Sequence, residues 1–182
     1  LPQLPYKKKE RFIKNYSLSA YEANVLVSEK EISDYFEEVV KTSDIKLAKN
    51  WIMGDLFASL NEKNISISQS PVTVKKMSQL IDSISSGVIS GRTAKEVFEI
   101  MKESGEEPNK IIESKGLQQK SDPKELEKII EKILTENNDK VEQYKSGKDK
   151  LFGFFVGQVM KISGGKANPQ LVNQILKNKL KK

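Results

Sequence analysis

The chain has 182 residues, of which 37% are hydrophobic and 31% charged, and it carries neither cysteine nor histidine. These absences exclude disulfides and thiolate zinc sites, and they remove the commonest general base and metal ligand. No apolar run approaches the ~20 residues that a membrane-spanning helix needs. Residues 1–115 hold 17 Lys and Arg against 17 Asp and Glu, whereas residues 116–182 hold 14 against 8. This asymmetry fits contact with a nucleic acid or a membrane surface, and equally a lysine-rich solvated surface.

Helical periodicity dominates the sequence, and no stretch alternates steadily between apolar and polar residues, so we expect an all-α fold. The opening residues contain neither an initiator Met nor a signal peptide, which indicates a cut inside a longer chain. Ser19 and Glu22 form a capping box, and Asp44 is a suitable N-cap. We interpret Trp51 as a core anchor rather than a ligand platform. Before residue 116 we expect helices over residues 7–16, 20–27, 28–42, 45–63, 74–86, 91–104 and 108–115.

The stretch 116–121, GLQQKS, is polar and has no helical periodicity. We interpret it as a flexible linker between a helical middle domain, residues 1–115, and a small helical tail domain, residues 122–182. At the start of the tail, Asp122 and Pro123 supply an N-cap and a first helical residue. The sequence therefore predicts a helical bundle followed by a small, flexibly linked helical domain.

The C-terminal stretch 148–180 is predicted to form an apolar helix, a glycine-rich turn and a second amphipathic helix. Gly153 and Gly157 share a helix face, which we expect to pack tightly against another tail helix. Asn168 is a suitable N-cap for the second helix. Between Lys150 and Lys182 there are seven Lys and no Asp or Glu, so we expect this hairpin to face an anion.

The string Gly164-Gly165-Lys166 resembles part of a phosphate-binding loop, but its context does not fit. Ala167 stands where that motif requires Ser or Thr, and the preceding element is a predicted helix rather than a strand. We therefore reject a nucleotide-hydrolase site. A glycine-rich turn facing a helix start could still hold a phosphate through its N–H groups, and a plain helix–helix connection is the alternative.

Gly91 and Arg92, with Lys95, form a second and weaker candidate anion site at a helix start. A carboxylate such as Glu96 or Glu99 would offset these cations equally well. No set of residues supplies a nucleophile, a base and an oxyanion hole together, so we expect no catalysis by this chain alone.

Four stretches carry a resemblance to a known family: YSLSAYEANVL (16–26), KLAKNWIMGDL (46–56), ISGRTAKEVFE (89–99) and, above all, GFFVGQVMKISGGKANPQLVNQIL (153–176). They resemble the B subunit of the glutamyl/aspartyl-tRNA amidotransferase over essentially the whole chain, corresponding to its middle and tail domains. The resemblance implies a non-catalytic, tRNA-recognising part of an enzyme that converts Glu-tRNA(Gln) to Gln-tRNA(Gln), Asp-tRNA(Asn) to Asn-tRNA(Asn), or both, using glutamine and ATP.

The resemblance also implies partners and a location. They are tRNA and the A and C subunits, in the cytoplasm and without a membrane, and we expect the chain by itself to be monomeric. ATP and Mg²⁺ would bind in an N-terminal domain outside this chain, which itself would hold no cofactor or metal. The alternative is a helical module that packs on partner subunits or on a synthetase without touching RNA.

In the family, the tail domain contacts the outer corner of the tRNA. We therefore expect the tRNA-binding residues to be Lys148, Lys150, Lys161, Lys166 and Lys177, with Asn168 and Gln170 as neutral donors. Ile162, Ser163 and Gly164 stand where relatives often carry Lys- or Gly-bearing variants.

Overall fold

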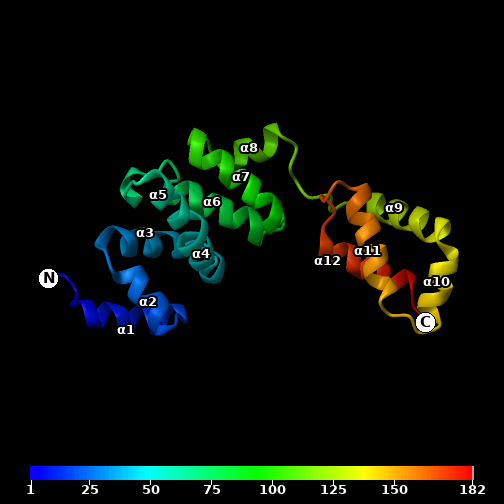
Figure 1. Cartoon of the computed structure of the whole chain (residues 1–182), viewed down its shortest axis with the longest axis horizontal. Helices are drawn as coiled ribbons and strands as arrows, with labels where there is room; N and C mark the ends of the chain where they lie inside the picture. Colours follow the sequence, from blue (N-terminus) through cyan, green and yellow to red (C-terminus); the bar gives the residue numbers. More distant parts are fainter. Residues whose placement is uncertain (182) are drawn as a thin grey trace. The chain divides into compact units, whose positions relative to one another are not determined.

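A computed structural model describes residues 1–181, and this part of the chain is helical and contains no β-strand, which confirms the all-α class (Figure 1). The elements are α1 (Pro5–Tyr16), α2 (Ala20–Val27), α3 (Lys30–Val40), α4 (Ile45–Trp51), the π-helical turn η1 (Ile52–Leu56), α5 (Phe57–Lys63), the 3₁₀ turn η2 (Ile67–Gln69), α6 (Val74–Ser85), α7 (Gly91–Ser104), α8 (Pro108–Ser114), α9 (Pro123–Glu136), α10 (Asn138–Lys145), α11 (Leu151–Ile162) and α12 (Pro169–Lys179).

The chain divides into two compact units. The first unit comprises residues 1–86 and 92–115, and the second comprises residues 87–91 and 116–182. Residues 87–91, which we expected in the middle domain, thus group with the second unit. In that unit the backbone N–H of Gln119 donates to the carbonyl of Val88 at 2.7 Å, a long-range bond without a local sequence signal. Flexibility of the stretch 116–121 stays a prediction.

In the first unit, aromatic rings join α1 to α3. The ring centroids of Phe12 and Phe36 lie 5.7 Å apart, and Tyr16 packs edge-on against both. Trp51 is only 5% exposed and its ring lies 5.6 Å from that of Phe98 on α7, which confirms its role as a core anchor.

The helix predicted over residues 45–63 is present, with Asp44 capping it through its Oδ1, which accepts the N–H of Leu47 at 2.8 Å. The periodicity did not reveal the π-helical turn η1 in its middle. Salt bridges link this long helix to α7: Lys95 pairs with Asp55, Lys102 with Glu62 at 3.5 Å, and Lys63 with Glu103 at 3.2 Å. These pairs connect the two helices at the protein surface.

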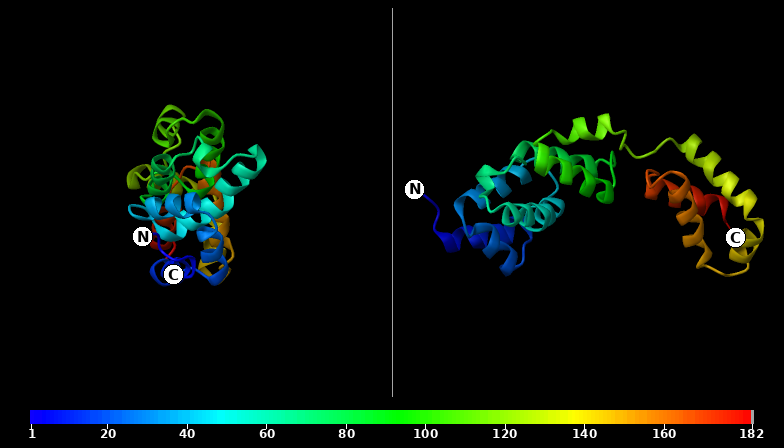
Figure 2. Two further views of the ribbon diagram at one scale, coloured as in Figure 1. Left: turned by 90° about the vertical axis from the view of Figure 1, so that its left-hand side faces the viewer. Right: turned by 45° about the horizontal axis from the view of Figure 1, so that its top comes forward.

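The second unit packs α9, α11 and α12 around one core, and the three helices lie together in the right-hand view of Figure 2. Its buried side chains come from all three helices and from the turn and end that flank α12: Leu126, Ile130, Ile133, Phe155, Val159, Ala167, Val172, Ile175, Leu176 and Leu180. The unit therefore has an apolar core of its own.

The prediction that Gly153 and Gly157 pack against another tail helix is wrong. Both glycines are exposed, and a Cβ built at either position would meet no atom within 4 Å. The reason is rotational: α11 buries Phe155 and Val159, each two residues beyond a glycine and so on the opposite side of the helix. The glycines therefore face solvent.

Candidate nucleic-acid interface

One exposed stripe of α11 combines two lysines with a surface that lacks side chains. The N-cap residue Lys150, which has helical backbone angles, is followed on α11 by Gly153, Gly157 and Lys161 at steps of three and four residues, so the four lie along one face, and all are exposed. At 1.5 Å per residue, Lys150 and Lys161 stand about 17 Å apart along the axis. We call these four residues the α11 stripe. Its bare helical backbone between two cations would let an extended anionic chain approach closely.

The turn after α11 does not form the anion site that we considered. Gly164 and Gly165 have φ values of 63° and 77°, in the left-handed region that favours glycine. The N–H of Gly164 donates to the carbonyl of Lys161 at 3.2 Å, and that of Gly165 to Met160 at 2.8 Å. The glycines therefore end α11 with a C-terminal cap, and their N–H groups are already used.

The backbone N–H groups at the start of α12 also have hydrogen-bond partners within the chain. The side-chain oxygen of Asn168 accepts the N–H groups of Gln170 and Leu171, at 3.1 and 3.4 Å. Its amide nitrogen donates to Ser121 Oγ at 3.3 Å. Asn168 is thus the N-cap that we expected, and its role as a donor to RNA stays a prediction. Gln170 itself has an exposed side chain.

Lys166 also has a structural task. Its Nζ donates to the carbonyl of Gly116 at 2.8 Å, and the side chain is half-buried, while tRNA binding by Lys166 stays a prediction. Its own carbonyl accepts the N–H of Lys120 at 2.6 Å. The sequence gives no sign of this contact because the two segments lie 50 residues apart.

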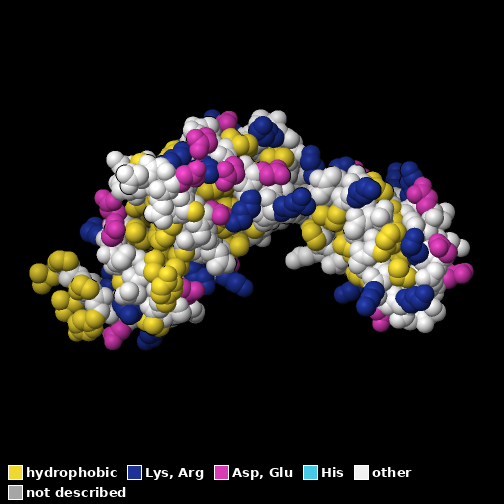
Figure 3. Space-filling view, viewed as in Figure 1, with side chains coloured by type: hydrophobic (Ala, Val, Ile, Leu, Met, Phe, Trp, Pro, Cys, Tyr) yellow, Lys and Arg dark blue, Asp and Glu magenta, His cyan; other side chains and the backbone are white. Residues whose placement is uncertain are grey.

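The remaining candidate lysines are spread over the second unit. Lys148 lies in the loop before α11, where its Nζ donates to Gln143 Oε1 at 3.3 Å, and Lys177 is exposed in the last turn of α12. Neither belongs to the α11 stripe. On the face shown in Figure 3, Lys and Arg side chains are distributed across this unit rather than gathered at one point.

Sequence reasoning missed one cation beside α11. Lys140 on α10 holds its Nζ 4.6 Å from the ring centroid of Phe154, which follows Gly153. Such a cation–π contact fixes the lysine while its charge stays available at the surface. No sequence pattern indicates it, because the contact depends on how α10 and α11 pack.

In the second candidate anion site, in the first unit, one of the two cations, Lys95, is already paired. Lys95 pairs with Asp55 and lies 4.6 Å above the ring of Trp51, so the offsetting carboxylate is Asp55 rather than Glu96 or Glu99. Arg92 is exposed at the start of α7. Lys95 therefore forms a contact between α7 and η1.

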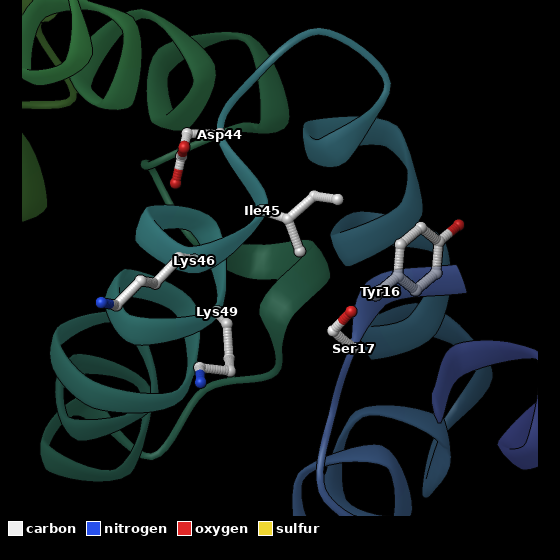
Figure 4. A pocket seen from close by; sticks show the side chains of 6 residues that line it. All are labelled: Tyr16, Ser17, Asp44, Ile45, Lys46 and Lys49. Carbon is white, nitrogen blue, oxygen red and sulfur yellow. The ribbon is translucent and has the colours of Figure 1, made fainter. Parts of the chain in front are cut away.

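A pocket of about 450 Å³ lies between the end of α1 and the start of α4, and its lining residues are Tyr16, Ser17, Asp44, Ile45, Lys46 and Lys49 (Figure 4). Lys46 and Lys49 extend away from Tyr16 and Ser17. Lys49 pairs with Glu22 at 3.0 Å, and the Tyr16 hydroxyl donates to Glu37 at 3.1 Å. The polar atoms therefore do not converge on a reacting centre.

Residues 1–181 contain no cluster of three or more acidic side chains placed to hold a metal ion. Nor does any helix in that range have the length and apolar character to span a membrane.

The fold and its surface define an all-helical protein of two compact units, the second of which presents a cationic helix face. The chain belongs to the family described as the GatB domain, whose model matches residues 34–180.

The chain is similar to proteins named as the B subunit of aspartyl/glutamyl-tRNA(Asn/Gln) amidotransferase. The protein of that name from Pelagibacter ubique is 57% identical, over 99% of this chain and 37% of the relative. Those from Nitrosococcus oceani and Ehrlichia ruminantium are both 52% identical, again over 99% of this chain and over 38% and 37% of their own lengths. The chain thus spans little more than a third of these relatives.

Proposed function

We propose that this chain is the tRNA-contacting part of a tRNA-dependent amidotransferase, and that the α11 stripe is its principal RNA contact. The complete enzyme would convert Glu-tRNA(Gln), Asp-tRNA(Asn) or both to the amidated forms. In this proposal ATP and Mg²⁺ bind to the part of the subunit outside this chain, and the A and C subunits complete the enzyme in the cytoplasm.

The observation that carries the proposal is the exposure of Gly153 and Gly157 between two lysines. Glycine in a helix interior costs about 1 kcal/mol relative to alanine, and here no packing neighbour requires it. Close approach of a partner's backbone is a physical reason for a bare helix face. Lysines at both ends favour a polyanion, and they would read the position of phosphates rather than the identity of bases.

The test is the salt dependence of tRNA binding by the full chain. Lys150→Glu combined with Lys161→Glu should weaken binding and flatten the slope of log affinity against log salt by roughly 1.5, since two phosphate contacts are lost. We leave Lys166 unchanged because its bond to Gly116 would confuse a binding defect with a structural one.

A matched control is available in the same unit. Lys128 and Lys132 are both exposed on α9, so changing them to Glu alters the net charge equally. This control should keep most of the affinity and the parental slope. Equal losses of tRNA affinity in both double variants would mean that only the total charge matters. A Lys150/Lys161 variant that keeps the parental affinity and salt slope would show that the stripe is not part of the tRNA interface.

A further inference from the structure

The turn between α11 and α12 binds the stretch 116–121, and we call the hydrogen bonds between residues 166–168 and this stretch the clasp. At the end of the stretch the clasp is made of backbone groups. The N–H of Lys120 donates to the carbonyl of Lys166 at 2.6 Å, and the carbonyl of Lys120 accepts the N–H of Asn168 at 3.0 Å. This pairing is an isolated β-bridge of the parallel kind. Main-chain atoms therefore hold the end of the stretch on the second unit.

At the beginning of the stretch the clasp depends on a side chain. Lys166 Nζ donates at 2.8 Å to the carbonyl of Gly116, which directly follows the last residue of the first unit. Gly116 has a φ of 60°, and a Cβ built on it would meet no atom within 4 Å. Glycine in open space has the greatest backbone freedom of any residue. The bond from Lys166 therefore restrains the chain at a point where it could otherwise pivot.

The ammonium of Lys166 keeps donor capacity at the surface. An ammonium has three N–H groups, and the bond to Gly116 uses one of them. Within residues 1–181 no salt bridge includes Lys166, and the carboxylate of Glu125 pairs with Lys120 at 3.4 Å instead. The half-buried stem and the carbonyl bond hold the ammonium in place, so an anion that meets it loses less entropy in ordering the side chain.

We propose that Lys166 holds the beginning of the stretch 116–121 and binds a phosphate of tRNA at the same time, so that tRNA binding tightens the clasp. The ammonium donates one N–H to Gly116 and the other two to the phosphate, and the carbonyl bond need not break. Because the closed clasp orders the lysine, the phosphate binds the closed form better than the open one. By reciprocity, bound phosphate stabilises the closed clasp by the same factor. This inference rests on the proposed contact with tRNA but not on the α11 stripe.

The first test measures the mobility of the stretch without tRNA. The chain has no cysteine, so Gln118→Cys places a unique nitroxide spin label at an exposed position two residues after Gly116. Lys166→Met keeps an unbranched stem but cannot donate, and it should raise the mobile fraction of the label by about twofold or more, as expected for the loss of a hydrogen bond from a charged group. Lys166→Arg should keep the fraction near that of the parent. Equal mobile fractions in the parent and Lys166→Met overturn the inference.

The second test adds tRNA at saturation. A label at Lys128→Cys, exposed on α9, is the control that corrects for slower tumbling of the complex. In the parent the mobile fraction at position 118 should fall by about twofold or more beyond the change at position 128, and in Lys166→Met it should follow the control. Inorganic phosphate at matched ionic strength should change neither label, and an equal effect of free phosphate overturns the assignment to RNA.

The outcomes separate this inference from the proposed function. If tRNA binds but the mobile fraction at position 118 falls equally in the parent and Lys166→Met, or rises in the parent, the inference is overturned and the proposed function stands. If the parent chain does not bind tRNA at all, the proposed function is overturned, and this inference with it.

Discussion

Arg11 and Glu37 form the best-defined ion pair in the first unit. The two guanidinium Nη atoms donate to the two carboxylate oxygens at 2.7 and 2.8 Å, which is a bidentate pair between α1 and α3. The hydrogen bond from Arg11 is the largest cause that lowers the pKa of Glu37 below its ordinary value. A carboxylate whose pKa is lowered by folding stabilises the protein above its unfolded pKa, and this stabilisation disappears as the pH falls through the folded value.

Glu37→Gln should therefore reduce the free energy of unfolding at pH 7 by about 1–2 kcal/mol, because a charge-assisted bidentate contact is lost. The difference from the parent should begin to shrink below about pH 4, where Glu37 of the unfolded chain becomes protonated, and should disappear as the pH falls through the lower pKa of the folded carboxyl. Urea denaturation at several pH values measures this. Glu38→Gln is the neighbouring control, since Glu38 pairs with Lys41 at the surface, and it should change little. A Glu37→Gln deficit that is constant from about pH 7 to about pH 3 would refute the ion-pair explanation.

Among the elements, the extent of α11 was predictable from the sequence, but the face that it buries was not. Its extent was predictable because apolar residues recur at helical steps between Leu151 and Ile162. Its orientation was not, because apolar residues lie on most of its circumference and only the packing selects Phe155 and Val159 for burial. The capping roles of Ser19, Asp44 and Asn168 were local and therefore readable. Two features depend on tertiary packing, so no local sequence pattern predicts them. They are the hydrogen bond from Lys166 to Gly116 and the π-helical turn η1.

The exposed position of Gly157 leads to a prediction in which stability and binding move in opposite directions. Gly157→Leu places a side chain in open space, so helix propensity should raise the free energy of unfolding by up to about 1 kcal/mol. The same side chain would hold an RNA backbone away from α11 and should weaken tRNA binding. Thermal unfolding and tRNA affinity, measured on the same preparation, separate the two effects. A clear loss of stability would instead mean that the glycine face is packed.

At the scale of the whole molecule, backbone hydrogen bonds within the second unit hold the end of the stretch 116–121. Lys120 donates its N–H to Lys166, and its carbonyl accepts the N–H of Asn168 at 3.0 Å. Lys115 and Gly116 are exposed at the end of α8, where the side chain of Lys166, rather than a backbone N–H, donates to the Gly116 carbonyl. The flexible part of the predicted linker 116–121 should therefore lie near its beginning.

Limited trypsin digestion tests this directly, since both lysines are cleavage sites. The first cut should follow Lys115, and cleavage after Lys120 should be slower because its backbone must first leave its hydrogen bonds. Mass spectrometry of early fragments gives the order. A first cut inside residues 45–60 or 150–176 would be incompatible with two separately folded units.

Cross-linking from one position tests most directly whether the α11 stripe touches tRNA. Because the chain has no cysteine and Gly157 has open space around it, Gly157→Cys can carry a photoactivatable aryl azide without disturbing the core. Lys128→Cys on α9 provides an exposed control in the same unit. We expect the probe at position 157 to cross-link tRNA well above the control, with high salt or unlabelled tRNA abolishing the product. Equal or weaker cross-linking at position 157, with tRNA still bound, would contradict contact between the α11 stripe and tRNA.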